Sequence, residues 1–121
     1  MKKGFKQTNV EKEHFAVVKK GMRNVMTQGT ARLFDIPDLV FCGKTGTVQN
    51  NKGKDHALFI GFAPMNDPQI AVSVILENAG FGATYAAPIA SLLMEFYITR
   101  NIRNAERLNQ IIQTNLIDND E

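Results

Sequence analysis

The spacing of apolar residues predicts an amphipathic helix near the start of the chain. Between residues 10 and 27, large apolar side chains recur at intervals of three and four, from Phe15 to Val25. This periodicity is typical of a helix that buries one face. Thr8 and Glu11 have the spacing of a capping box, so we expect a hydroxyl and a carboxylate to cap the start of this helix.

A second helical pattern covers residues 84–98. Its larger apolar residues are spaced at i, i+3, i+4 and i+7, which predicts that the face packed on the sheet consists of Ile89, Leu92, Leu93 and Phe96. Pro88 fits this helix if it lies in the first turn. We expect a main unit at residues 1–98, followed by a polar tail at residues 99–121 that is either an exposed helix or disordered.

The middle of the chain predicts three β-strands. The apolar residues 39–42 lead into a strand that carries a polar motif, and two further apolar runs occupy residues 57–64 and 69–77. Polar segments with glycine or proline separate the runs, as in hairpins. The third run is apolar almost throughout, which predicts a central strand covered on both faces. The expected fold class is α+β, a three-stranded antiparallel meander packed with flanking helices.

Composition excludes several classes of function. The 121 residues are 44% hydrophobic with a formal net charge of +2, too small to indicate nucleic-acid binding. There is no run of about 18 apolar residues and no signal-peptide pattern, so we expect this piece itself to be soluble. Cys42 is the only cysteine, and His14 and His56 are far apart, so we expect no metal site and no cofactor.

The segment Gly43-Lys44-Thr45-Gly46-Thr47 admits two functional interpretations. A phosphate-binding loop would need a glycine where Asp38 stands and a helix after Thr45, and the sequence provides neither. An extended strand can instead aim an ammonium group and hydroxyls at an anionic substrate, with a glycine that lets the substrate approach. The structural alternative is an ordinary buried strand that ends in a polar turn.

Several segments together resemble the transpeptidase domain of class B penicillin-binding proteins, most closely the penicillin-binding protein 2 type. The resemblance rests on the Lys-Thr-Gly-Thr motif at 44–47, "HALFIGFAP" at 56–64, "IAVSVILEN" at 70–78 and "GATYAAPIA" at 82–90. It extends more loosely to "GMRNVMTQGTA" at 21–31. It implies the C-terminal part of a penicillin-binding/serine β-lactamase-like fold, in an enzyme of peptidoglycan biosynthesis, the cell wall and cell shape.

The resemblance implies a role for each residue of the motif. Lys44 would supply positive charge near a serine of another motif and near the substrate carboxylate. Thr45 and Thr47 would offer hydroxyls to that carboxylate, and Gly46 would give the substrate room. The backbone N–H of Thr47 would form half of an oxyanion hole. The implied reaction is cross-linking of peptidoglycan stem peptides by a D,D-transpeptidase through an acyl-serine intermediate, which β-lactams trap.

The sequence departs from the family in its serines. Ser73 and Ser91 are the only ones, and neither begins a Ser-x-x-Lys or a Ser-x-Asn motif. We therefore expect a fragment of a larger enzyme that is inactive alone. Three alternatives remain: a D,D-carboxypeptidase, a β-lactam sensor or hydrolase of the same fold, and a non-catalytic interaction module.

The resemblance also implies partners and a location. The parent protein would bind the stem peptide and β-lactams, and would be anchored in the inner membrane with this domain on the periplasmic side. The fragment would pack on the remainder of the transpeptidase domain. By itself it could form a homo-oligomer through residues 70–78, whose strand would lack a neighbour.

The remaining candidate side chains have structural interpretations. Cys42 is expected to be a small buried side chain. His56 is expected mainly in a turn or strand-edge contact, with a role near the site as the lesser alternative. Glu77 is expected to be solvated or paired. The aromatic residues are expected in the core or at its edge: Phe59, Phe62, Phe81, Phe96 and Tyr97.

Overall fold

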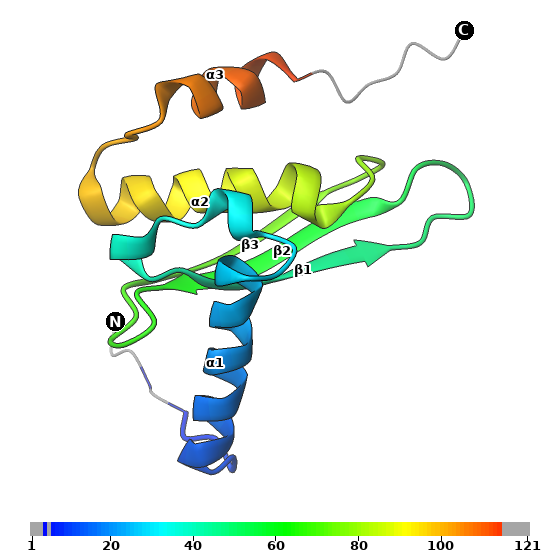
Figure 1. Ribbon diagram of the computed structural model, residues 1–121. Helices are drawn as coiled ribbons and strands as arrows, with labels where there is room; N and C mark the ends of the chain where they lie inside the picture. Colours follow the sequence, from blue (N-terminus) through cyan, green and yellow to red (C-terminus); the bar gives the residue numbers. More distant parts are fainter. Residues whose placement is uncertain (1–3, 5, 115–121) are drawn as a thin grey trace, which may run out of the picture.

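The computed structural model describes residue 4 and residues 6–114. In it, α1 projects away from one side of a small antiparallel sheet, α2 lies along the opposite face, and α3 lies outside α2 (Figure 1). The elements, in chain order, are α1 (Lys12–Thr27), the 3-10 turns η1 (Arg32–Phe34) and η2 (Pro37–Leu39), β1 (Cys42–Val48), β2 (His56–Ala63), β3 (Ile70–Leu76), α2 (Gly82–Thr99) and α3 (Ala105–Gln113).

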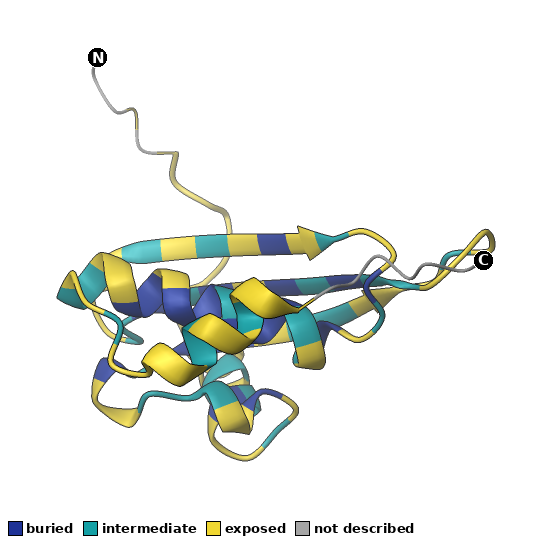
Figure 2. Ribbon diagram, turned by 90° about the horizontal axis from the view of Figure 1, so that it is seen from above, coloured by how far each residue is buried: buried dark blue, intermediate teal, exposed yellow. Residues whose placement is uncertain are grey.

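The sheet is the predicted antiparallel meander, with strand order β1-β2-β3. Its register pairs Thr45 with Phe59, and Phe59 with Val74. The prediction that the third strand is central and covered on both faces is wrong. Within the described residues β2 is central, and β3 lies at an edge with every second side chain exposed, as the strand along the upper edge of Figure 2 shows. The helix α2 covers one face of the sheet, and no other element among the described residues covers the opposite face at β3.

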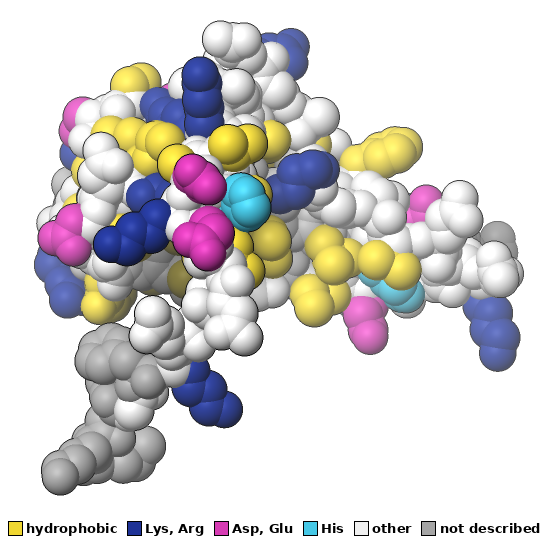
Figure 3. Space-filling model, turned by 90° about the horizontal axis from the view of Figure 1, so that it is seen from below, with side chains coloured by type: hydrophobic (Ala, Val, Ile, Leu, Met, Phe, Trp, Pro, Cys, Tyr) yellow, Lys and Arg dark blue, Asp and Glu magenta, His cyan; other side chains and the backbone are white. Residues whose placement is uncertain are grey.

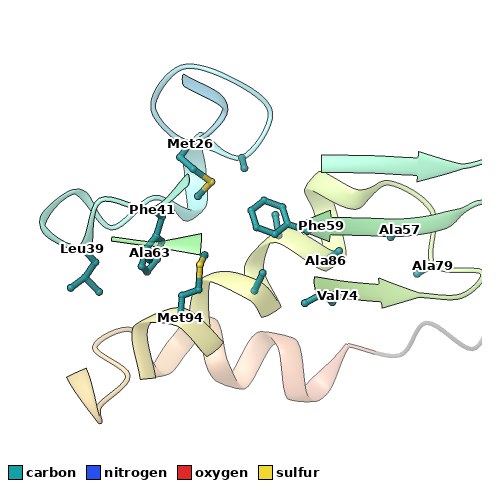
Figure 4. Close-up of a cluster of buried hydrophobic side chains, with 13 residues drawn as sticks. Met26, Leu39, Phe41, Ala57, Phe59, Ala63, Val74, Ala79, Ala86 and Met94 are labelled. Atoms are coloured by element: carbon teal, nitrogen blue, oxygen red, sulfur yellow. The ribbon is translucent and has the colours of Figure 1, made fainter. Parts of the chain in front are cut away.

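The core lies between the sheet and α2. Phe59 from β2, Met94 from α2, and Met26 from the end of α1 are fully buried in one cluster (Figure 4). Phe41, which precedes β1, belongs to the same cluster. Burial of these large apolar side chains contributes on the order of 1.5–3 kcal/mol each, so the core fixes α2 and the end of α1 against β1 and β2.

The predicted buried face of α2 is largely wrong. The helix packs on the sheet through small residues and Met94, while Leu93 and Phe96 remain half exposed and Ile89 is partly buried. Of the four predicted residues only Leu92 is buried. The reason is the close approach of α2: a Cβ on Gly82, its first residue, would collide with the carbonyl oxygens of Gly46 and Leu58. At that separation alanines fit and large side chains turn outward.

The expectation that Pro88 lies in the first turn of its helix is also wrong. Pro88 is inside α2, in the second turn rather than the first. A proline there cannot donate to the carbonyl oxygen four residues earlier, which belongs to Thr84. The helix continues to Thr99 regardless, because Ala86, Ala87 and Ala90 around the proline are fully buried against the sheet.

Two local predictions before β1 are also wrong. The α1 helix begins after Glu11, with no side-chain hydrogen bond at its cap, so Thr8 and Glu11 do not form a capping box. Leu39 and Val40 are not part of a strand, since Leu39 ends η2 and Val40 adopts a left-handed conformation with φ of 48°. Pro37 starts that 3-10 turn, and β1 begins only at Cys42.

The C-terminal tail contains a helix, α3, as one of the two alternatives predicted; residues 115–121 lie outside the described residues. Arg103, which precedes α3, forms ion pairs with Asp38 at 2.8 Å and with the buried Glu95 at 3.6 Å. The tail is thereby tied to α2 and η2. The division of the chain at residue 98 stays a prediction.

The predictions that five aromatic residues lie in the core or at its edge are only partly correct. Phe59 is buried and Phe62 partly so, but Phe81 is 70% exposed, and Phe96 and Tyr97 are about half exposed. Phe81 stands before the close-packed start of α2, where there is no room for its ring on the sheet. Among the helices that the structure describes, none is long and apolar enough to cross a membrane.

Candidate substrate-binding strand

The Lys-Thr-Gly-Thr segment lies on β1, at an edge of the described sheet. Side chains alternate between the faces of a strand, so Lys44 and Gly46 share one face while Thr45 and Thr47 share the other with Phe59 and α2. The sequence prediction of a strand is correct. The ammonium and the two hydroxyls can nevertheless act on a single ligand only if it lies along the free edge of β1.

Lys44 is exposed, and its Nζ donates a hydrogen bond to the carbonyl oxygen of Thr45 at 2.7 Å. Within the described part of the chain no carboxylate lies within ion-pair distance of this ammonium. Arg23 and Arg103, in contrast, each hold a carboxylate. The positive charge of Lys44 is therefore available to an anion from outside this chain.

The two threonines differ in their contacts. The hydroxyl of Thr45 lies 2.8 Å from the hydroxyl of Thr30, in the loop between α1 and η1. Thr47 is exposed, and no hydrogen bond of its side chain is found among the described residues. One hydroxyl is thus held in place by the loop, and the other is accessible to solvent.

The glycines around the segment have different environments. A Cβ on Gly43 would collide with the ring of Phe59, so this glycine makes room for the core. A Cβ on Gly46 would meet only the Cβ of Leu58, at 3.4 Å, which is an ordinary contact. The packing of the described residues therefore does not require a glycine at position 46, and the space beside it is open.

The start of β1 is anchored to α1 by Arg23. One of its guanidinium nitrogens donates to the carbonyl oxygen of Phe41 at 2.7 Å and to the carboxylate of Asp35 at 2.6 Å. Both charged side chains are largely buried. Such charge-assisted hydrogen bonds are among the stronger ones in proteins, so the entry of the chain into β1 is fixed from the helix side.

Cys42, Ser91 and His56 make contacts that support the fold. This was predicted for Cys42, and it was the main prediction for His56. Cys42 is fully buried, and burial raises the pKa of its thiol, an effect opposed by the charges of Arg23 and Lys19. Ser91 is fully buried and donates to the carbonyl oxygen of Phe34.

The Nδ1 of His56 accepts a hydrogen bond from the backbone N–H of Asn78, a contact between the start of β2 and the turn that follows β3. Glu77 is exposed, as predicted. Ser73 is exposed on β3, on the same face as Ile60 and Ile75. The register places Ser73 in the same cross-strand row as Lys44, with Ile60 of β2 between them, so Ser73 does not adjoin the Lys-Thr-Gly-Thr strand. No hydrogen bond found among the described residues joins Ser73 or Ser91 to that segment.

Sequence reasoning missed two residues that shape this strand. Thr30 was not singled out, although it belongs to the "GMRNVMTQGTA" segment of the resemblance, which was the available signal. Gly82 lies outside the helix predicted at residues 84–98, whereas in the structure it lets α2 begin directly on the backbone of Gly46. The Thr30–Thr45 contact joins residues 15 positions apart, and the Gly82 contact joins a helix to a strand. Neither contact produces a periodic pattern in the sequence.

Comparison with known proteins places this geometry in a family. Residues 2–95 match the penicillin binding protein transpeptidase domain. The peptidoglycan D,D-transpeptidase MrdA of Haemophilus influenzae is 37% identical over 113 residues, which cover 78% of this chain and 17% of that protein.

Two solved structures are also similar. Penicillin-binding protein 2 of Pseudomonas aeruginosa, in complex with WCK 5153, has a TM-score of 0.68 at 37% identity, over 77% of this chain and 21% of that one. Penicillin-binding protein A of M. tuberculosis, as a ceftriaxone acyl-enzyme complex, has a TM-score of 0.61 at 28% identity, over 68% of this chain and 20% of that one.

The chain therefore belongs to the penicillin-binding protein transpeptidase family. Within it, the similarity is to the penicillin-binding protein 2 type, as the sequence resemblance predicted, and the chain is a fragment of the transpeptidase domain. It spans about a sixth of the length of the curated MrdA relative.

Proposed function

We propose that this chain supplies the substrate-binding edge strand of a peptidoglycan D,D-transpeptidase, which cross-links stem peptides through an acyl-serine intermediate. The observation that carries the proposal is the exposed ammonium of Lys44, which has no carboxylate partner among the described residues, on a strand with a free edge. A cation without a protein counter-ion, on the same strand as the exposed hydroxyl of Thr47, suits an anionic substrate.

In this proposal the residues of β1 bind and orient, and a serine outside this chain performs the covalent step. Lys44 attracts the substrate carboxylate and the second serine motif, and the hydroxyls of Thr45 and Thr47 donate to that carboxylate. The open space at Gly46 lets the substrate backbone lie along the strand. The N–H of Thr47 contributes to the oxyanion hole, where a donor acts most strongly on the developing charge.

The chain alone would then be catalytically inactive, because neither of its serines is beside the strand. The complete reading frame is expected to extend upstream into Ser-x-x-Lys and Ser-x-Asn. A stop codon directly upstream of residue 1 would instead favour a non-catalytic interaction module, and this observation separates the two functions before any assay.

A direct test compares Lys44→Ala with Lys52→Ala in the complete protein. Both remove one exposed lysine, but Lys52 lies in the hairpin loop between β1 and β2. We expect Lys44→Ala to slow acylation by a fluorescent penicillin roughly 10²–10³-fold, since one lost interaction with the transition state has that effect. Its melting temperature should match that of Lys52→Ala, which should acylate normally. Equal losses of stability and acylation rate in Lys44→Ala would mean that this lysine is structural.

The proposal includes two packing partners. The sheet face away from α2 exposes apolar side chains beside α1 (Figure 3), among them Ile60 and Ile75, each more than half exposed. We assign this face to the remainder of the transpeptidase domain. In the isolated chain, β3 has no neighbour on its outer side within the described residues, which supports self-association through residues 70–78.

The parent protein would bind the stem peptide and β-lactams at this strand. It would be anchored in the inner membrane with the domain on the periplasmic side, where peptidoglycan is assembled. The similarity to a peptidoglycan D,D-transpeptidase supports a location where peptidoglycan is the substrate.

A further inference from the structure

A cavity of about 350 Å³ lies between α2 and α3, with η1 and the end of β3 completing its wall. This volume falls within the range of roughly 300–1,000 Å³ that is usual for small-molecule sites. The wall is mainly apolar, and it contains one cationic side chain. The residues that matter for its chemistry are Phe34, Leu76, Thr84, Pro88, Ile89 and Arg107.

Arg107 is held in a fixed position at this wall. Its guanidinium donates to the carbonyl oxygen of Leu33 at 2.9 Å and lies over the ring of Phe34, 5.3 Å from the ring centre. Within the described residues it has no carboxylate partner, unlike Arg23 and Arg103. A guanidinium has five N–H donors, so an anion in the cavity could be bound without breaking the existing contacts.

Apolar side chains form much of the same wall. Leu76 comes from the end of β3, and Pro88 and Ile89 come from α2. The site thus places the positive charge of Arg107 beside the apolar surfaces of Leu76, Pro88 and Ile89.

We propose that this cavity binds a small amphipathic carboxylate. The carboxylate would pair with the guanidinium of Arg107, and the apolar body would lie against Leu76, Pro88 and Ile89. Uncharged polar side chains also line the wall, but Arg107 is the one charged residue among the described lining residues, so the site suits a singly charged, partly apolar ligand better than a nucleotide with several phosphates. Since α3 has no fully buried residue of its own, the ligand would also tie α3 to α2 and stabilise the fold through binding.

The test uses 4-phenylbutyrate and its uncharged analogue 4-phenylbutyramide on the full chain. Binding is followed by the methyl NMR signals of Leu76, Ile89 and Ile111, all of which line the cavity. We expect both probes to shift these signals, with the carboxylate binding roughly tenfold more tightly because a charge-assisted pair replaces a neutral hydrogen bond.

Two variants and a matched control complete the experiment. Arg107→Gln should weaken the carboxylate to the affinity of the amide, whereas Arg100→Gln, an exposed arginine outside the cavity wall, should change nothing. Thr84→Phe fills the cavity from the exposed start of α2 and should abolish the shifts of both probes.

Equal affinity of the two probes for the original chain would overturn the proposal, as would probe shifts that persist in Thr84→Phe. Arg107→Gln could detach α3, which would move the Ile111 methyl signal to its random-coil position before any probe is added. In that case the comparison of the two probes on the original chain, together with Thr84→Phe, still tests the proposal. Acylation of the parent protein is not part of the readout, so this proposal and the transpeptidase proposal can fail separately.

Discussion

The hydroxyl groups of Thr30 and Thr45 lie 2.8 Å apart and share a hydrogen bond between the loop after α1 and the Lys-Thr-Gly-Thr segment. The backbone around Thr30 is itself fixed, since the neighbouring Ala31 is fully buried and donates its N–H to the carbonyl oxygen of Val25. The loop therefore holds the Thr45 side chain in one orientation along the strand. Thr30 acts as a positioning residue in the proposed site.

The first prediction concerns this contact. In the complete protein, Thr30→Val removes the hydroxyl and keeps the shape, so acylation by a fluorescent penicillin should slow about two- to tenfold, the equivalent of one ordinary hydrogen bond. Stability should change by less than about 0.5 kcal/mol, because position 30 is exposed. Thr30→Ser keeps the hydroxyl and should restore the rate. An unchanged rate in Thr30→Val would show that Thr45 does not need this partner.

The second prediction separates two glycines that lie against each other. Gly82→Ala should destabilise the chain by about 1–3 kcal/mol or more, because its Cβ would overlap the carbonyl oxygens of Gly46 and Leu58. Gly46→Ala should leave the free energy of unfolding nearly unchanged, since its Cβ meets only Leu58 at 3.4 Å.

Chemical denaturation of the two variants of this chain measures both effects. In the complete protein, Gly46→Ala should still slow acylation, because the added methyl group occupies space that the proposal assigns to the substrate. A Gly46→Ala protein that is stable and acylates at the original rate would contradict that assignment.

The third prediction is that this chain alone forms no covalent adduct with a fluorescent penicillin. Ser91 is buried and already donates its hydroxyl to Phe34, and Ser73 is exposed without a lysine three residues later. Cys42 is buried, and the pKa of its thiol is raised by burial, which keeps it in the unreactive protonated form.

The measurement is a denaturing gel after incubation with the penicillin, followed by mass spectrometry. Alkylation of Cys42 by iodoacetamide provides the control: it should be slow in the folded chain and fast after unfolding. A labelled band that survives denaturation would refute the prediction, and the modified residue would identify the nucleophile.

The fourth prediction is self-association of the isolated chain through β3. The strand is apolar, contains no proline and has no charge before Glu77, so its free edge is a template for a second copy. Light scattering should give a dimer, the simplest closed arrangement for such an edge.

Two lysine substitutions on the same sheet face test where the copies meet. Ile75→Lys lies on β3 and should yield a monomer, whereas Val48→Lys lies on β1 at the opposite edge and should remain a dimer. A monomeric original chain, or a dimer that only Val48→Lys disrupts, would exclude pairing through β3.

Local sequence patterns were sufficient to predict most of the elements and the candidate strand. Apolar runs separated by turn residues predicted β2 and β3 to within one residue at each end, because strand and turn preferences are local. The first run was predicted from residue 39, whereas β1 begins only at Cys42. The identity of the motif followed from its neighbours. Asp38 excluded a phosphate loop, and the segments around residues 44–47 indicated the family that the comparisons confirm.

The buried faces and the residues that hold the strand in place depend on how the elements pack together. Large apolar residues predicted the packing face of α2, but the contact of Gly82 with β1 and β2 admits only small side chains, so Leu93 and Phe96 point outward. Close approach between two backbones is a property of the assembled layers, and helical periodicity does not record it. The same holds for Thr30 and Thr45: their contact exists because the core brings a loop and an edge strand together.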